Sequence, residues 1–187
     1  MHGGGFTGSG EDNMGTTVRV DFREGRFRVL ASSVEMGQGS ATILPMIAAE
    51  ALGVRIEDVT APPADTDRAP NSGPTVASRT TMFVGAATHD ACGNLVKKLI
   101  EFLANENACP PSEVAFEEGR FSVRGRSLPI LDTAAACLAQ RGELSAEGVY
   151  KGPATDNPWD EQQFSGDAYK GYSWLATVSA KDRKSVV

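Results

Sequence analysis

Hydrophobic and polar residues alternate over two neighbouring stretches, and this alternation predicts a β-hairpin. Val18, Val20 and Phe22 alternate with polar residues over 17–22, and a second extended run covers 27–33 beyond the turn at 23–26. Short runs of the same type predict further strands at 59–64, 114–116, 121–123, 128–130, 149–151 and 172–180.

Apolar residues recur at helical spacing in three other stretches. The first predicted helix begins near Ser40 and ends at Gly53. The second is long, and a short third helix is expected over 132–140. The apolar stripe of the long helix predicts core packing and contains Phe83, Ala87, Ala91, Leu95, Leu99 and Leu103.

The mixed order of these elements predicts an α+β fold, with mixed β-sheet elements and packed helices. Residues 1–14 are expected to form a glycine-rich loop, because glycine loses much backbone entropy in regular structure. Residues 15–187 are expected to form one α+β domain. We expect this domain to be incomplete, since the last strand pattern continues to Val187.

Composition excludes several classes of protein. The 41% hydrophobic and 22% charged residues are typical of a globular domain, and the net charge of -6 argues against a nucleic-acid surface. Cys92, Cys109 and Cys137 are too far apart for a Cys-x-x-Cys pair, which predicts reduced structural thiols. Neither a signal peptide nor about 18 consecutive apolar residues occurs, so a cytoplasmic location without membrane insertion is expected.

Two glycine-bearing segments have the residue types of a ligand site. In the first, Gly37 and Gly39 allow close backbone approach, Gln38 offers a carboxamide, and the following helix start offers unpaired N–H groups. The second segment, 71–81, offers Thr75, Ser78 and Thr80 as caps or hydroxyl donors at the next helix start. Two such helix starts can converge on one polar ligand.

These segments, in this order, resemble a known family. Glu35-Met36-Gly37-Gln38-Gly39, a helix, Asp65-Thr66-Asp67 and Pro74-Thr75-Val76-Ala77-Ser78 before a long helix are similar to the molybdopterin-binding subunit of the xanthine dehydrogenase and aldehyde oxidase family. The resemblance covers nearly the whole chain. It implies an internal fragment of a molybdenum-dependent hydroxylase or dehydrogenase that binds the cofactor and lines the substrate pocket.

The resemblance also assigns roles to residues. It implies a molybdopterin site at Gly37, Gln38, Gly39, Val76, Ala77, Ser78 and Thr80, and a substrate pocket lined by Phe6 and Thr7. No catalytic residue and no metal ligand is expected here, because the family's glutamate motif, Gly-x-Gly-Glu-like, has no counterpart before Val187. The isolated chain is therefore expected to be inactive.

The family's other components are implied in the same way. FAD and 2Fe-2S clusters are expected on other domains or subunits, an aldehyde or N-heterocycle is the expected substrate, and the full enzyme is expected to be an oligomer. Whether the pterin carries a cytosine dinucleotide stays open, as do the substrate and the electron acceptor.

Structural interpretations stand beside these functional ones. The rival function is a non-catalytic α+β binding or scaffolding domain with structural glycine loops. A Gly-x-Gly-x-x-Gly pattern at 3–8 has no strand before it and predicts no dinucleotide site. Asp65 and Asp67 favour a turn over a metal pair, Arg79 is either a phosphate contact or a solvated helix residue, and His89 has no partner at ligand spacing.

Overall fold

A four-stranded sheet forms the centre of the computed structural model, which describes residues 2–6, 16–76, 78–152, 160, 162–163, 165–166 and 169–173. Its strand order is β4-β3-β2-β8. The predicted hairpin is confirmed as β2 (Thr16–Arg23) paired antiparallel with β3 (Arg26–Leu30). The strand β8 (Ser145–Tyr150) pairs antiparallel with β2, and the short β4 (Val59–Thr60) runs parallel to β3.

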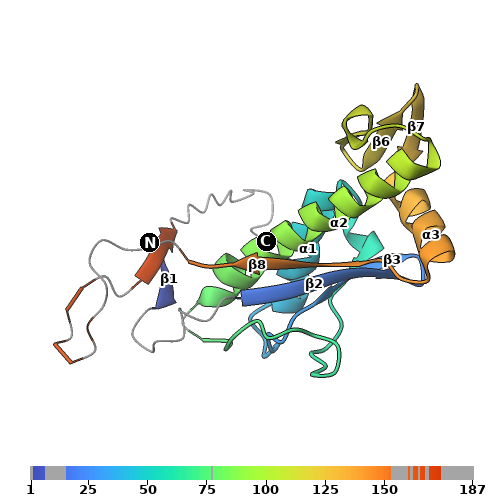
Figure 1. Cartoon of the computed structure of the whole chain (residues 1–187). Coiled ribbons are helices and arrows are strands. Elements are labelled where there is room, and N and C mark those ends of the chain that lie inside the picture. The colour runs from blue at the N-terminus through green and yellow to red at the C-terminus, as the bar shows by residue number, and fades with distance from the viewer. Residues whose placement is uncertain are drawn as a thin grey trace, which may run out of the picture.

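Two helices lie on one face of this sheet (Figure 1). Helix α1 covers Ser40–Leu52 and begins where the sequence predicts. Helix α2 covers Gly85–Glu106 and continues directly from a π-helical turn, η3 (Thr80–Val84). The opposite face of the sheet is polar, with the ion pairs Arg19–Glu147 and Arg28–Asp21, so the alternation along β2 separates a core face from a charged face.

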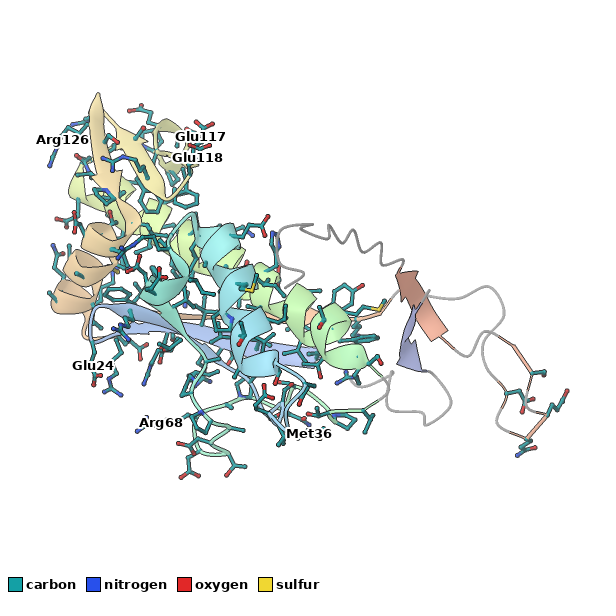
Figure 2. The ribbon with its side chains drawn as sticks, turned by 180° about the vertical axis from the view of Figure 1, so that it is seen from behind. Glu24, Met36, Arg68, Glu117, Glu118 and Arg126 are labelled. Carbon is teal, nitrogen blue, oxygen red and sulfur yellow. The ribbon has the colours of Figure 1, made fainter. Side chains whose placement is uncertain are left out.

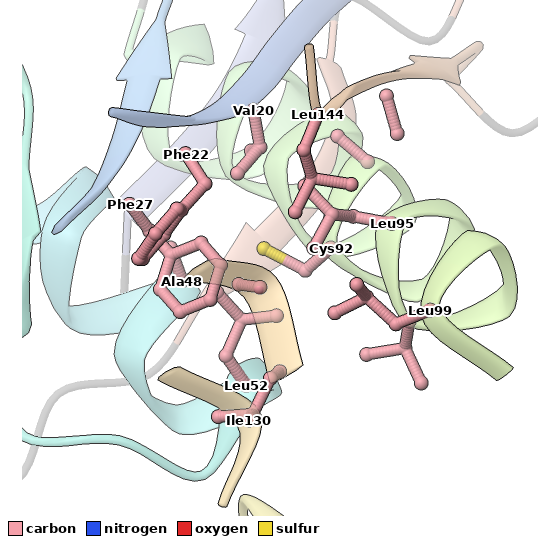
Figure 3. Close-up of a cluster of buried hydrophobic side chains, with 14 of the residues drawn as sticks. Val20, Phe22, Phe27, Ala48, Leu52, Cys92, Leu95, Leu99, Ile130 and Leu144 are labelled. Atoms are coloured by element: carbon pink, nitrogen blue, oxygen red, sulfur yellow. The ribbon is translucent and has the colours of Figure 1, made fainter. Parts of the chain in front are cut away.

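The hydrophobic core fills the space between the sheet and the helices, as Figure 3 shows. The buried side chains of β2 and β3, among them Val20, Phe22 and Phe27, meet Leu52 of α1 and Leu95 of α2. The rings of Phe22 and Phe27 lie 4.9 Å apart, centroid to centroid. The apolar stripe of the long helix is therefore core, as predicted.

A second, smaller layer covers the far end of α2. It contains a three-stranded antiparallel sheet of β5 (Ala115–Glu117), β6 (Arg120–Val123) and β7 (Arg126–Pro129), followed by α3 (Ile130–Arg141). Two short 3-10 turns, η2 (Ile56–Asp58) and η4 (Pro111–Glu113), join neighbouring elements. Phe121 and Ile130 extend the main core into this layer, and the predicted α+β fold is confirmed.

The opening residues depart from the prediction. His2–Phe6, expected to be loop, form strand β1, which pairs antiparallel with β9 (Tyr169–Ser173). The prediction was wrong for these residues because a two-stranded ladder needs only backbone N–H and C=O groups, which glycine also has. The partner strand comes from a distant segment that local pattern does not indicate. Residues 7–15 and 174–180 lie outside the described part of the chain.

Two other strands have different bounds from those predicted. The expected strand at 59–64 ends at Thr60, since Pro62 and Pro63 have no N–H to donate to a ladder. The strand expected at 149–151 begins already at Ser145. Its buried positions are the small residues Ala146 and Gly148, which give no apolar signal but let α2 approach closely. Of the described helices, none has the length and apolar character needed to cross a membrane.

Gly148→Ala should destabilise the fold, because the added Cβ would lie 2.1 Å from the Ala91 backbone nitrogen and 2.3 Å from the Ala87 carbonyl oxygen. We expect a loss of about 1–3 kcal/mol in the free energy of unfolding, measured by urea denaturation. Gly93→Ala is the control, because its Cβ would meet no atom within 4 Å and alanine favours helix over glycine. Equal stability of the two variants would contradict this packing.

Candidate functional site

The two glycine-bearing segments lie side by side at one end of the sheet. Ser32, just after β3, and Ser72 bond reciprocally: the Ser72 N–H donates to Ser32 Oγ at 2.8 Å, and the Ser32 N–H donates to Ser72 Oγ at 3.0 Å. Ser72 is fully buried, and its hydroxyl donates to the Thr17 carbonyl at 2.9 Å. The second segment is thereby fastened to both β2 and β3.

Two residues further along, a third contact joins the segments. The Val34 N–H donates to Thr75 Oγ1 at 3.0 Å. Figure 2 shows Met36 in the loop before α1, away from Arg126 of the three-stranded sheet. The two segments that precede the helix starts therefore lie next to each other, and their binding of one shared ligand stays a prediction. Thr75 takes part through an acceptor oxygen that joins the segments, and not as a helix cap.

The N–H groups at the start of α1 are bound by the carboxylate of Glu35. Its Oε1 accepts from the N–H groups of Gly37 at 2.7 Å and Gly39 at 3.1 Å. Its Oε2 accepts from the Ala41 N–H at 2.8 Å and from Ser40 Oγ at 3.0 Å. The prediction that this helix start presents unpaired N–H groups is thus wrong, because the carboxylate of Glu35, in the loop before the helix, binds them.

These contacts change the acidity of Glu35. Hydrogen bonds from Ala41, Gly39 and Gly37 lower the pKa of its carboxyl group from 4.5 to about 2, although the side chain is exposed. The N–H donors favour the charged form, since only the carboxylate accepts all of them well. The loop therefore carries a fixed negative charge at every pH above about 3, following from that shift.

The side chain of Gln38 is turned into its own loop. Its Nε2 donates to the Val34 carbonyl at 2.7 Å and to Ser40 Oγ at 3.2 Å, and its Oε1 accepts from the Met36 N–H at 2.7 Å. An amide oxygen has two lone pairs, so Oε1 retains capacity for one further donor. The carboxamide was predicted to offer donors and an acceptor to a ligand; in this conformation both donors are used.

The backbone of the first loop leaves its outer side open. Gly37 and Gly39 have φ values of 103° and 86°, which L-residues rarely adopt, so both glycines are needed for the turn. A Cβ on either residue would meet no atom within 4 Å. A flat ligand can therefore approach this backbone closely, and the neighbouring side chain of Met36 is exposed.

The second segment enters its helix through an irregular turn. Ser78 is exposed and has a φ of 58°, and the following residues form the π-helical turn that contains Thr80. Val76 is also exposed. Ala77 and Thr7 lie outside the described residues, as does the side chain of Phe6. Irregular helical turns of this type are frequent at functional sites.

Arg79 has neither of the roles considered from the sequence. Its side chain is buried, at 2% exposure, and its Nη1 donates to the carbonyls of Ser72 at 2.9 Å and Pro74 at 3.1 Å. Its Nη2 donates to Thr16 Oγ1 at 2.7 Å, and the guanidinium stacks over the Phe83 ring at 4.8 Å. Arg79 is therefore an internal clamp that holds the second segment against β2.

Other candidate groups have structural explanations. Asp65 shapes a turn, where its Oδ1 accepts from the Asp67 N–H at 3.0 Å, as predicted. His89 is exposed on α2, and the described residues contain no group of three or more potential metal ligands. The three cysteines are free, and burial raises the pKa of the Cys92 thiol to about 12, so this thiol is a poor nucleophile.

Comparisons with known proteins identify the family. A family model described as molybdopterin cofactor-binding domain matches residues 1–180. The chain belongs to this family. It is 30% identical over 174 residues to xanthine dehydrogenase 2 of Arabidopsis thaliana, an alignment that covers 93% of this chain and 11% of that protein. The chain thus spans about a tenth of the length of this relative.

Solved structures support the fold of this cofactor-binding domain. The Cu,Mo-CO dehydrogenase structure matches with a TM-score of 0.66 and 23% identity, covering 73% of this chain and 18% of that one. The aldehyde oxidoreductase from Desulfovibrio desulfuricans matches with a TM-score of 0.55 and 22% identity, covering 90% of this chain and 16% of that one. Both matches show the fold, and the family model confirms the family that the sequence motifs predict.

Sequence reasoning missed two residues of this molybdopterin-binding domain, Glu35 and Ser40. An acidic side chain shortly before a helix start is a signal that could have identified Glu35. Ser40 gave no such signal. Its importance depends on bonding Glu35 and Gln38 together, which only the folded loop brings about.

Arg79→Met should lower stability, because the substitution leaves the buried Ser72 carbonyl, the partly buried Pro74 carbonyl and the Thr16 hydroxyl without this donor. We expect a loss of about 2–4 kcal/mol in the free energy of unfolding, measured by urea denaturation. Arg68→Met is the control, since Arg68 is exposed and its contact to Asp65 spans 3.6 Å; its effect should stay within about 0.5 kcal/mol. Similar losses for both variants would argue against the clamp.

Glu35 should remain ionised in mild acid. A carboxyl whose pKa is lowered on folding stabilises the fold above its unfolded pKa near 4.5, and this contribution is lost as the pH falls towards about 2. Titration of the Glu35 side-chain carbon by NMR should therefore show a midpoint near 2. Glu35→Gln identifies the resonance, and a midpoint near 4.5 would show that the loop does not bind the carboxylate in solution.

Proposed function

We propose that this domain forms one wall of the cofactor site in a molybdenum-dependent oxidoreductase. The observation that supports this most is the direct joining of the two loops, through Ser32 with Ser72 and Val34 with Thr75, in a member of the cofactor-binding family. When bound, the molybdenum cofactor would supply the redox chemistry, and the residues of this chain would bind and orient it.

The residues fit a flat polar ring system at the first loop. Gln38 Oε1 can accept from a ring N–H, and the open backbone of Gly37 and Gly39 allows the ring to lie against it. The phosphate would belong at the second segment, where Ser78 lies just before the π-helical turn and Thr80 within it, both with hydroxyl groups. Val76 and Ala77 are proposed to contribute backbone groups to the same site. Glu35 disfavours an anion at the start of α1.

Phe6 and Thr7 are proposed to line the substrate pocket. Strand β1, which ends at Phe6, contacts η3, the turn that follows the second segment. An aromatic ring at this point would stack on a flat substrate, and a threonine hydroxyl would bond to it. We propose an aldehyde or an N-heterocycle as the substrate, by analogy with the relatives named xanthine dehydrogenase and aldehyde oxidoreductase.

The remaining components are proposals of the same kind. Iron-sulfur and flavin groups on other domains or subunits would carry electrons away, and the enzyme would be a cytoplasmic oligomer. The cofactor would be molybdopterin, either alone or as its cytosine dinucleotide. Liquid chromatography of the released pterin would distinguish the two forms by the presence of cytosine.

The purified full-length protein should contain molybdenum at about one atom per chain. Gln38→Ala should lower this content about tenfold, because it removes the acceptor for the ring together with the carboxamide that braces the loop. The measurement is elemental analysis of protein whose fold is checked by circular dichroism. Gln140→Ala on α3 is the control, since this glutamine is exposed and bonds only to Glu106 among the described contacts. Folded wild-type protein without molybdenum would contradict the proposal.

A further inference from the structure

Glu35 is exposed, yet its carboxylate is turned inward to the loop and not outward to solvent. One oxygen binds the N–H groups of Gly37 and Gly39, and the other binds the N–H of Ala41 and the hydroxyl of Ser40. The N-cap residue of α1, Gly39, has no side chain with which to cap the helix. Glu35 therefore replaces a conventional cap from four residues upstream, and it spans the whole turn.

Ser40 connects this carboxylate to Gln38. The Ser40 hydroxyl donates to Glu35 Oε2 at 3.0 Å and accepts from Gln38 Nε2 at 3.2 Å. The Ser40 hydroxyl has one proton, which it donates to Glu35. Towards Gln38 it can therefore only accept a hydrogen bond, so the NH₂ end of the Gln38 carboxamide faces Ser40. The Gln38 oxygen is then directed to the Met36 N–H, and it keeps its second lone pair for a ligand. Ser40 is buried, so water does not compete freely for this link.

We propose that Glu35 is a positioning residue for the molybdopterin cofactor: through Ser40 it sets the orientation of Gln38, and its charge keeps the cofactor phosphate away from the start of α1. This inference rests on the proposed function. Glu35 touches neither the ring nor the substrate in this assignment and acts only through the loop. The two effects have the same result, since both direct the neutral ring to the first loop and the anionic end to Ser78 and Thr80.

Charge supports the second effect. The start of a helix attracts anions. Without Glu35, the three N–H groups at 37, 39 and 41 at the start of α1 would be available to a phosphate. With Glu35 in place, a phosphate there would meet a carboxylate that carries its full charge at neutral pH. The second segment has no such carboxylate among its described residues 71–76 and 78–81, so the anionic end is favoured there.

A different role would give the opposite result. If Glu35 only occupied the phosphate position until the cofactor arrived, its removal would relieve competition and strengthen cofactor binding. If Glu35 positions the loop, its removal weakens binding. The sign of the change in cofactor release therefore separates the two roles.

The experiment compares Glu35→Gln, Ser40→Ala and the control Glu50→Gln in the full-length holoprotein. Glu35→Gln removes the charge and replaces one accepting carboxylate oxygen with an NH₂ group, whereas Ser40→Ala removes the hydroxyl that joins Glu35 to Gln38 and keeps the Glu35 charge. Glu50 is exposed near the other end of α1, so its variant loses the same charge outside the loop. The readouts are the rate of pterin release, followed by fluorescence after dilution, and hydrogen exchange of 36–42 by mass spectrometry.

We expect pterin release about tenfold faster in Glu35→Gln and Ser40→Ala than in wild type, with Glu50→Gln unchanged. Hydrogen exchange should accelerate at 36–42 in Glu35→Gln, while circular dichroism should show that the fold is retained. Unchanged or slower release in Glu35→Gln would overturn the positioning role and leave the proposed function intact. Folded wild-type protein without pterin would overturn both. If pterin release were as fast in Glu50→Gln as in Glu35→Gln, the positioning role would also be overturned, because a general charge effect would then explain the result.

Discussion

The reciprocal bonds between Ser32 and Ser72 are the contact on which the site depends. They join the two chain segments through side-chain hydroxyls beyond the end of β3. Ser72 also bonds to the Thr17 carbonyl, so one buried hydroxyl fixes three segments that are far apart in sequence. A buried hydroxyl without these partners would be costly, which makes the arrangement specific.

The two loops that are joined in this way are stabilised by different means. The first is braced by an anion, Glu35, that binds the helix start from outside. The second is held by a cation, Arg79, that binds carbonyl groups from inside. Both charged groups are used to shape backbone, and so neither serves as a direct contact for the cofactor phosphate in the arrangement proposed here. Neutral amide and hydroxyl groups are left to face the ligand.

This division explains why the residues of the two loops should differ in their tolerance to substitution. Gly37 and Gly39 are required by their positive φ values, although the space beside them is open. Arg79 is required by burial and by the number of its partners. The exposed side chains of Met36 and Val76 are restricted neither by backbone conformation nor by burial. In the arrangement proposed here, the polar edge of a flat heterocycle would bond to Gln38 and its face would lie against the glycine backbone.

Local pattern was enough for most of the fold. The hairpin of β2 and β3, the start of α1 at Ser40 and the core stripe of α2 follow from alternation, glycine turns and helical spacing. The motif order was also enough for the family. The strand β1 and the early start of β8 were missed, because glycine and alanine carry no apolar signal when a partner segment or a helix approaches them closely.

What the sequence by itself determined, then, is the set of elements, the family and the two loops that belong together. What only the tertiary structure decided is where the charges and donors point. Glu35 turns back onto its own helix start, Gln38 turns into its loop, and Arg79 turns inward to carbonyl groups. The physical reason is that a hydrogen bond depends on distance and direction between groups, and residue spacing along the chain specifies neither once the backbone leaves regular structure.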